Sequence, residues 1–307
     1  MAAGFVLGTA QLGLAYGRTN AVGNLSDEAA LGLLEAAYAS GVREIDTARA
    51  YGLSEQRIGE FVRAHGVRDL RILTKLSPLQ DLTPEAGEAD VASTVRQSLE
   101  TSLANLHLDR LPVLMLHRPD HADAFGGAVL RELRRWREKG AIGALGASVN
   151  VPKELAQVMT HRDFEHIQLP YNLLDRRWPA ALEKDAAGRA FHVRSVFLQG
   201  LLANPQTAAW PDVPGYEPAA LARSLEIAAE RLKRRGVRDL AVAYVRGQAW
   251  IGGCVVGVER PEQLAENLRL FEQPPLTADE IALVREALPP VPSALVEPWT
   301  WPPVKAA

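Results

Sequence analysis

Four side chains in the N-terminal half of the chain could together donate a proton to a carbonyl group. They belong to Asp46, Tyr51, Lys75 and His117. A tyrosine hydroxyl has an ordinary pKa of about 10, and a nearby ammonium lowers that pKa by favouring the tyrosinate. A carboxylate keeps the ammonium charged, and a neutral imidazole can hold a carbonyl oxygen through a hydrogen bond. These residue types predict carbonyl reduction. Tyr51 would be the general acid, tuned by Lys75 and Asp46, and His117 would orient the carbonyl.

Each of these residues also has a structural explanation when it is taken alone. Asp46 and Lys75 could form a buried ion pair, His117 could be a core histidine, and Tyr51 could serve only in packing. However, the four residues follow short apolar runs at 42–45, 71–73 and 111–116, which read as the second, third and fourth strands. The carboxyl ends of parallel barrel strands share the rim that carries chemistry, so their convergence there favours a catalytic site.

Short apolar runs alternate with longer amphipathic segments along the whole chain. The runs predict strands at 5–7, 43–46, 72–74, 113–116, 144–147, 166–169, 193–197 and 254–258. The segments between and after them predict helices at 27–40, 54–64, 91–106, 122–139, 152–160, 177–187, 218–235 and 261–271. Eight such units are what a (β/α)8 barrel needs, so we expect one domain over 1–307, with the barrel at about 5–272.

Three segments fall outside the eight units. Residues 200–217, with three prolines, are expected to form a long loop over the carboxyl-end face. Residues 277–288 predict an extra helix. The proline-rich tail that follows is not expected to form regular structure. Its residues Trp299 and Trp301 are expected to pack on the barrel wall, or alternatively to help close the pocket.

Composition narrows the possible partners and the compartment. The net charge is -3, and the basic runs at 134–137 and 231–235 have acidic neighbours, which argues against nucleic acid or a membrane as a partner. A single cysteine, Cys254, fits a reducing compartment. Neither a signal-like segment nor an 18-residue apolar run is present, so we expect a cytoplasmic protein.

Two other kinds of site were considered. The glycines at 140, 143 and 146 have the wrong spacing for a dinucleotide-binding turn and lead into a strand, so a nucleotide would have to be held by barrel loops. His121 with Asp120 and Asp123 looks superficially like a metal site, but no companion motif supports it, and we expect no metal.

At this point the chain resembles the aldo-keto reductase superfamily, from Gly8 to about Leu288. The supporting motifs are Leu7-Gly8-Thr9, Asp46-Thr47-Ala48, Tyr51-Gly52, Ser54-Glu55, Ile58-Gly59, Thr74-Lys75, Leu116-His117, Pro119-Asp120, Gly146-Ala147-Ser148, Gln168-Leu169-Pro170-Tyr171-Asn172, Gly200-Leu201-Leu202, Pro261-Glu262-Gln263-Leu264 and Glu266-Asn267. The resemblance implies a barrel that binds NADPH or NADH across its carboxyl-end face and interconverts aldehydes or ketones with alcohols.

The resemblance also implies residue roles. Asp46, Tyr51, Lys75 and His117 would be catalytic. The cofactor would contact Gly8, Thr9, Asp46, Ser148, Gln168, Ser195, Phe197, Gly257, Arg260, Gln263, Glu266 and Asn267. Tyr16 and Arg118 would contact a small-molecule carbonyl substrate. The family is often monomeric, so a monomer or a weak homo-oligomer is expected.

Some positions depart from the family pattern. Val149 stands where an Asn is common, with Asn150 one place later, and Arg194 replaces the aromatic residue that usually stacks on the nicotinamide. Arg118 replaces an aromatic residue that often follows the catalytic histidine. If Arg118 and Arg194 lie near the pocket mouth, they would favour a polar or anionic substrate such as a sugar; alternatively, both pair with acidic loop residues.

Cofactor preference is a further hypothesis from the loop at 257–267. Glu259 adds negative charge there and Arg260 is the one cation in the loop, so dual use or a preference for NADH is expected. A rival function is a cofactor-binding sensor or regulatory subunit with little turnover. A barrel enzyme that handles phosphorylated substrates lacks an evident phosphate loop after the seventh and eighth strands.

Overall fold

The eight strands close into one parallel barrel. The computed structural model describes residues 2–18, 22–178, 182 and 188–302. The strands are β1 (Gly4–Gly8), β2 (Glu44–Asp46), β3 (Arg71–Lys75), β4 (Leu111–Leu116), β5 (Ile142–Ser148), β6 (Phe164–Pro170), β7 (Ala190–Arg194) and β8 (Gly253–Gly257). Each strand pairs in parallel with the next, and β8 pairs with β1, so the order around the barrel is the order along the chain. The prediction of a single-domain (β/α)8 barrel is confirmed.

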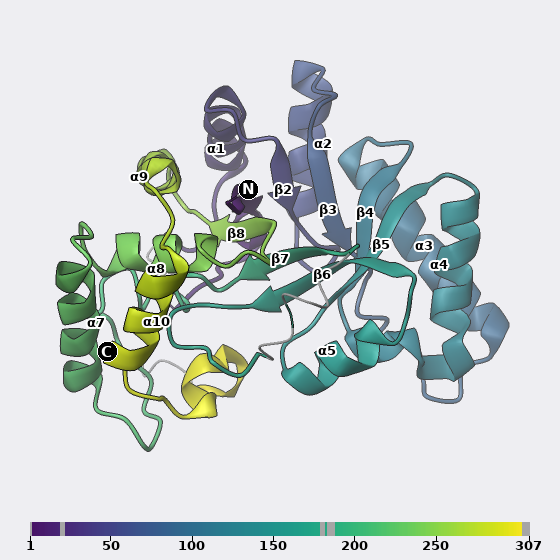
Figure 1. The fold of residues 1–307 in the computed structure, drawn as a ribbon. Helices are drawn as coiled ribbons and strands as arrows, with labels where there is room; N and C mark the ends of the chain where they lie inside the picture. The colour runs from purple at the N-terminus through teal and green to yellow at the C-terminus, as the bar shows by residue number, and fades with distance from the viewer. Residues whose placement is uncertain (1, 19–21, 179–181, 183–187, 303–307) are drawn as a thin grey trace.

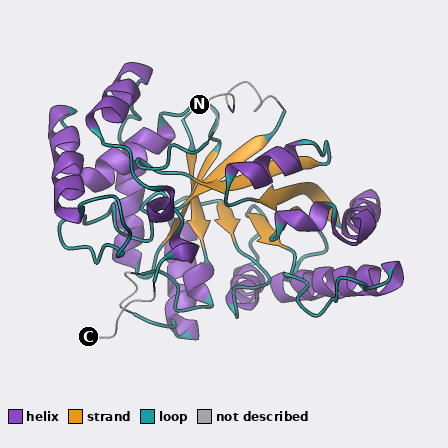
Figure 2. Ribbon diagram, turned by 90° about the horizontal axis from the view of Figure 1, so that it is seen from below, coloured by secondary structure: helices purple, strands orange, loops and turns teal. Residues whose placement is uncertain are grey.

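Helices surround this barrel (Figures 1 and 2). They are α1 (Asp27–Ala39), α2 (Ser54–His65), α3 (Glu88–Leu106), α4 (Ala128–Glu138), α5 (Pro152–Met159), α7 (Pro218–Arg231), α8 (Val237–Arg246), α9 (Pro261–Glu272) and α10 (Ala278–Ala287). Local signals explain several of their ends. The hydroxyl of Ser26 accepts from the amide of Ala29 at the start of α1, and Thr277 and Glu280 form a capping box at the start of α10. Gly41, at φ +87°, turns the chain from α1 toward β2.

Three predicted elements need correction or lie outside the described residues. The helix predicted at 122–139 begins only at Ala128, because Phe125 and Gly126 adopt positive φ and leave two short 3-10 turns before it. The helix predicted at 218–235 ends at Arg231, and a second helix, α8, follows it before β8. This helix was missed. Most of the helix predicted at 177–187 falls on residues 179–181 and 183–187, outside the described part of the chain.

The seventh strand lies earlier than predicted. It spans Ala190–Arg194, whereas the sequence favoured 193–197. Ser195, Leu198 and Gln199 all have positive φ, which ends the strand and forms a tight turn. The shift matters because it places Arg194 at the last position of β7 and Ser195 on the rim.

The proline-rich tail returns to the carboxyl-end face. It contains two short 3-10 helices, Ser293–Val296 and Pro298–Thr300, where no regular structure was expected. The indole nitrogen of Trp301 donates to the carbonyl of Ala294 at 2.9 Å. Arg18, far away in sequence, donates to the carbonyl of Pro302 and lies 5.5 Å from the Trp301 ring. The tail is therefore tied to the segment that follows β1.

The opposite end of the barrel contains a polar cluster. Glu44, Arg71, His166 and His192 come from the amino-terminal parts of β2, β3, β6 and β7. Arg71 lies 3.0 Å from the Glu44 carboxylate and 2.9 Å from Nε2 of His166, and the two imidazole rings stack at 5.6 Å. This cluster fills the barrel floor with polar groups, away from the rim described next. Nδ1 of each imidazole is buried without a hydrogen-bond partner among the described residues. Within the described residues, no helix has the length and apolarity needed to cross a membrane.

Candidate active site

The barrel brings Lys75 and Asp46 together at its carboxyl-end rim. Nζ of Lys75 lies 2.7 Å and 2.8 Å from the two carboxylate oxygens of Asp46, and it also donates to the carbonyl of Thr47 at 2.9 Å. Neither charged side chain is more than 4% exposed. Burial opposes the ammonium, but the Asp46 carboxylate outweighs it and raises the pKa of Lys75. The lysine therefore stays protonated.

Tyr51 lies beside this pair. Nζ of Lys75 is 5.1 Å from the centre of the tyrosine ring, and the imidazole of His117 meets that ring edge-on at 5.9 Å. Burial raises the pKa of Tyr51 above its ordinary value, although Lys75 and Arg194 act to lower it. The expectation that Lys75 lowers this pKa is thus met in direction, but burial has the larger effect.

His117 is neutral at physiological pH. Burial, together with the positive charges of Lys75 and Arg194, lowers its pKa to about 4. Its Nδ1 is buried and has no hydrogen-bond partner among the described residues. An uncharged imidazole beside a phenol is the state that the predicted orienting role requires.

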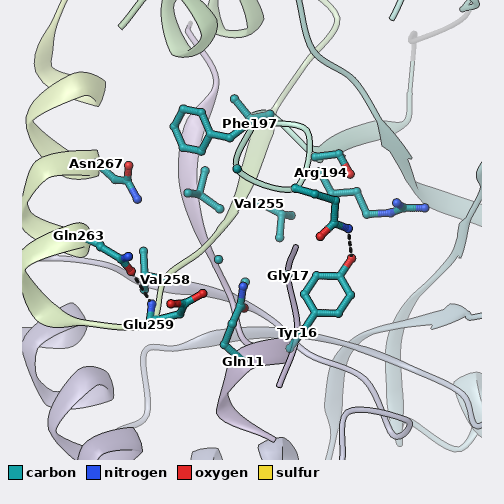
Figure 3. A pocket seen from close by; sticks show the side chains of 18 of the residues that line it. Gln11, Tyr16, Gly17, Arg194, Phe197, Val255, Val258, Glu259, Gln263 and Asn267 are labelled. Atoms are coloured by element: carbon teal, nitrogen blue, oxygen red, sulfur yellow. Dashed lines mark hydrogen bonds between the residues drawn. The ribbon is translucent and has the colours of Figure 1, made fainter. Parts of the chain in front are cut away.

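Two adjoining pockets open at this rim. The first runs from Asp46 and Tyr51 past the ends of β1 and β8 to α9 (Figure 3). The residues that line it include Gly8, Thr9, Gln11, Asp46, Tyr51, Arg194, Ser195, Phe197, Arg238, Gly257, Glu259, Gln263 and Asn267. Most of the predicted cofactor contacts therefore lie along one elongated cavity. Ser148, Gln168, Arg260 and Glu266 are not among its lining residues.

Polar atoms that a dinucleotide could use lie beside Asp46, next to the catalytic end of this cavity. The Nε2 of Gln168 donates to Asp46 at 2.7 Å, whereas its Oε1 is buried without a partner among the described residues. A free carbonyl oxygen beside the Asp46–Lys75 pair fits an amide donor. Glycines at the ends of β1 and β8 let neighbouring side chains approach the backbone closely at the cavity wall. A Cβ on Gly257 would lie 2.5 Å from Nε2 of Gln11, and one on Gly8 would lie 3.1 Å from Val255. These features fit a nicotinamide dinucleotide.

The far end of the cavity holds a cation that the sequence analysis missed. Arg238, on α8, donates to Glu266 at 2.6 Å and to Asn267 at 2.8 Å, and it lies 5.6 Å from the Phe197 ring. Its Nε is buried without a partner among the described residues. Arg260 is the one cation in the loop at 257–267, as expected from the sequence, but Arg238 brings a second cation to this end from another element. This second cation was not found from the sequence, because α8 was not predicted.

Glu259 and Gln263 lie at the same end of the cavity (Figure 3). The side-chain oxygen of Gln263 accepts from the backbone amide of Glu259 at 2.8 Å, which holds the start of the loop against α9. Burial raises the pKa of the Glu259 carboxyl, and Arg260 lowers it by a smaller amount. A carboxylate therefore faces the place where the nucleoside would lie.

The second pocket lies over the other side of Tyr51. Its lining residues are Tyr16, Gly17, Arg18, Tyr51, His117, Ser148, Asn150, Arg194, Ser195, Gln199, Pro298, Trp299, Trp301 and Pro302. Aromatic rings from the tail and from Tyr16 form one part of its wall, and His117 and Ser148 supply polar atoms. Trp301 packs on the core cluster, as one expectation for the tail holds, and it also lines this pocket. Trp299 lines the pocket but is 50% exposed, so the packing expectation is wrong for this residue.

The two arginines singled out from sequence behave differently. Arg118 is about half exposed, forms a two-point pair with Asp120, and lines neither pocket. Arg194 lines both pockets and donates to the carbonyl of Val149 at 3.2 Å and to the amide oxygen of Asn150 at 2.6 Å. The structure thus favours the paired alternative for Arg118, and it leaves Arg194 at the site. Among the described residues, no group of three or more His, Cys, Asp or Glu could hold a metal ion.

Comparisons with known proteins agree with this geometry. The Aldo/keto reductase family model matches residues 5–289. D-threo-aldose 1-dehydrogenase from a Pseudomonas species is 31% identical, over 83% of this chain and 87% of the relative. An aldo-keto reductase from Mycolicibacterium smegmatis is 29% identical, over 85% of this chain and 82% of the relative. The solved holo form of an aldo-keto reductase from Bacillus halodurans shares the fold, with a TM-score of 0.74 at 20% identity, over 94% of this chain and 92% of that one. The chain belongs to the aldo/keto reductase family, and it is an NAD(P)-dependent oxidoreductase that interconverts carbonyl compounds and alcohols.

Proposed function

We propose that this protein reduces a polar carbonyl compound to its alcohol, and oxidises that alcohol in the reverse direction, with Tyr51 as the proton-transfer group. The observation that carries the proposal is that Tyr51 lines both pockets and lies next to the buried Lys75–Asp46 pair. A bound nicotinamide cofactor supplies or accepts the hydride at this junction. The phenol of Tyr51 donates the proton to the carbonyl oxygen in one direction and receives it in the other.

Lys75 and His117 support that proton transfer in different ways. The ammonium of Lys75, held by Asp46, stabilises the tyrosinate when the proton leaves. The neutral imidazole of His117 offers a hydrogen bond to the carbonyl oxygen and carries no charge that would compete for the proton. Asp46 acts through Lys75 and Gln168, since its two oxygens accept hydrogen bonds from both.

The second pocket supports a sugar or another polar carbonyl compound as the substrate. Indole rings pack well against the C–H faces of sugars, while hydroxyl groups need polar partners. The pocket offers Trp299 and Trp301 for the first need and Asn150 and Gln199 for the second. A relative that is 31% identical carries the name D-threo-aldose 1-dehydrogenase, which supports the same class. Tyr16, from the segment after β1, would contact this substrate.

The first pocket would hold the cofactor, with the nicotinamide near Gln168 and Ser148 and the nucleoside near α9. Thr9, Ser195 and the glycines at 8 and 257 would line the middle. We propose that NADH serves at least as well as NADPH, because the Glu259 carboxylate lines this pocket and would repel a 2′-phosphate. A Glu259→Lys variant should shift the ratio of NADPH to NADH affinity toward NADPH, and an unchanged ratio would contradict this preference.

The test of the proposed function is a Tyr51→Phe variant. It removes the hydroxyl and keeps the ring that packs on His117 and Lys75. We expect the rate of aldose oxidation or aldehyde reduction to fall by about 10²–10⁴-fold. Cofactor affinity, followed by tryptophan fluorescence, should stay within about threefold. Retention of turnover by this variant would show that another group transfers the proton, and failure of the wild type to bind either nucleotide would overturn the function itself.

A further inference from the structure

Arg194 lies where the two pockets join. It lines both of them, together with Tyr51 and Ser195, and it occupies the last position of β7, on the same rim as the Lys75–Asp46 pair. Cofactor and substrate must both reach Tyr51 for the reaction to occur. The arginine therefore borders the region in which the hydride is exchanged.

The guanidinium of Arg194 is held in place without an acidic partner. It donates to the carbonyl of Val149 and to the side-chain oxygen of Asn150, both neutral groups. Among the described residues, no carboxylate lies within ion-pair distance of it. Two other cations near the site have acidic partners: Lys75 pairs with Asp46, and Arg238 pairs with Glu266. Arg194 is thus a fixed, uncompensated positive charge beside the reaction centre.

Charge changes at this centre during the reaction. In alcohol oxidation the C–H bond of the alcohol breaks, and its electron pair passes as hydride to the oxidised nicotinamide, which loses its positive charge. The O–H proton passes to the tyrosinate of Tyr51, which loses its negative charge. Tyr51 then releases this proton to solvent. The products are the carbonyl compound, the reduced cofactor and one proton. A nearby cation destabilises the cationic nicotinamide, and this effect favours hydride transfer to it. The same cation stabilises the tyrosinate, which makes the base form of Tyr51 available but opposes its uptake of the proton.

We propose that Arg194 biases this site toward alcohol oxidation. Its positive charge weakens the binding of the oxidised cofactor relative to that of the reduced cofactor, and a neutral residue at this position would not have this effect. The inference rests on the proposed function, because it requires the nicotinamide to lie beside Tyr51. It does not require a particular substrate. Arg194 acts on the charge balance of the reaction, whereas Tyr51 transfers the proton.

Other charged and titratable groups act on Tyr51 from the elements around it. They are Asp46 on β2, Lys75 on β3, His117 after β4 and Tyr16 after β1. Asp46 and Tyr16 raise the pKa of Tyr51, whereas Lys75 and Arg194 lower it. Arg194 also contributes to the low pKa of His117. The positive charge of Arg194 is therefore felt at both functional groups that face the second pocket.

The test measures the dissociation constants of NAD⁺ and NADH by calorimetry, with no substrate present. In Arg194→Met and Arg194→Gln, loss of the charge should lower the ratio of the NAD⁺ constant to the NADH constant by about tenfold, which corresponds to about 1.4 kcal/mol. Arg194→Lys keeps the charge and should keep the wild-type ratio within about threefold. Arg118→Met, which removes an exposed arginine paired with Asp120, is the matched control and should leave the ratio unchanged.

Two results would overturn the inference. The first is a ratio in both neutral variants within about twofold of the wild type, because about 0.4 kcal/mol would then be the most that the charge contributes. The second is an Arg194→Lys variant that behaves like the neutral ones, because shape and not charge would then matter. Either result leaves the proposed function standing as long as the wild type binds a nucleotide. A wild type that binds neither nucleotide would instead remove the proposed function and this inference with it.

Discussion

Nζ of Lys75 lies 2.7 Å and 2.8 Å from the two carboxylate oxygens of Asp46, in a pair that is almost completely buried. β2 and β3 are neighbours in the barrel, and each ends at one of these residues. A buried ion pair of this kind contributes little net stability, because desolvation offsets most of the attraction. Its value here is to hold one positive charge next to Tyr51.

Removing only one member of this pair is expected to destabilise the protein. Lys75→Met should lower the free energy of unfolding by about 3–5 kcal/mol, because it leaves the Asp46 carboxylate buried without its partner. Adding Asp46→Asn to that variant should restore most of the loss, since no buried charge then remains. Urea unfolding of the two single variants and the double variant measures this coupling. If the two losses simply add, the charges do not interact as the geometry indicates.

Arg238 is expected to contribute to cofactor affinity from the nucleoside end. Arg238→Ala removes the guanidinium from the pocket and leaves Glu266 and Asn267 without its hydrogen bonds. We expect NADH and 5′-AMP to bind about tenfold more weakly, which corresponds to the loss of one hydrogen bond to a charged group. Fluorescence and calorimetric titrations measure both affinities.

The control for that prediction is Arg231→Ala, which removes an exposed arginine from the end of α7. It changes the net charge of the protein equally and lies outside the pocket lining. A similar loss of affinity in both variants would point to long-range charge as the cause and would contradict a local role for Arg238.

The tail is expected to act on substrate affinity and not on cofactor affinity. Trp299 is 50% exposed and lines the second pocket, so Trp299→Ala removes pocket wall without opening a cavity in the core. We expect KM for an aldose to rise by about 5–20-fold, the loss of one aromatic contact, with unchanged NADH affinity and unchanged stability. Ile227→Ala, at an equally exposed position on α7, is the control. If KM does not rise in Trp299→Ala, whether or not it rises in Ile227→Ala, this role for the tail is excluded.

Two histidines, His166 in the barrel and the half-buried His117, are expected to make the fold sensitive to acid. The pKa values of His117 and His166 are lowered to about 4, mainly by burial. An unfolded chain binds these protons near pH 6.5, so between pH 6.5 and 4 the unfolded state holds more protons than the folded state. Stability from these residues is therefore present above pH 6.5 and is lost as the pH falls.

Substituting either histidine should remove part of this dependence. Each histidine should account for about 2 kcal/mol of the stability lost between pH 7 and pH 5. His117→Gln and His166→Gln should therefore be less destabilised, relative to the wild type, at pH 5 than at pH 7. Urea unfolding at the two pH values measures the difference. Parallel pH profiles for wild type and variants would show that these pKa values are not lowered in the folded protein.

The residues at the strand ends could be identified from the sequence because the barrel repeats one local rule. An apolar run followed by polar residues predicts a strand that ends at the rim, and parallel strands place all such ends together. Asp46, Lys75 and the residues around His117 each follow such a run, so local pattern was enough to place them near one another. The (β/α)8 architecture follows from the same alternation.

Helix α8 could not be identified in this way. Eight of its ten residues are buried. It is a second helix between β7 and β8, after α7, whereas the repeating pattern predicts one helix between successive strands. Its omission also concealed Arg238, which meets Glu266 and Asn267 only because α8 packs beside α9.

The sequence by itself determined the barrel, the order of its elements and the group of Asp46, Tyr51, Lys75 and His117, because these depend on local patterns of burial and on the shared direction of parallel strands. The tertiary structure alone decided which charges are compensated and which residues enclose the second pocket. Arg118 is paired with a residue two positions away, whereas Arg194 lies against neutral groups on another strand end. Arg18 and the tail meet across nearly the whole chain. Contacts of that range arise from packing, which no local pattern encodes.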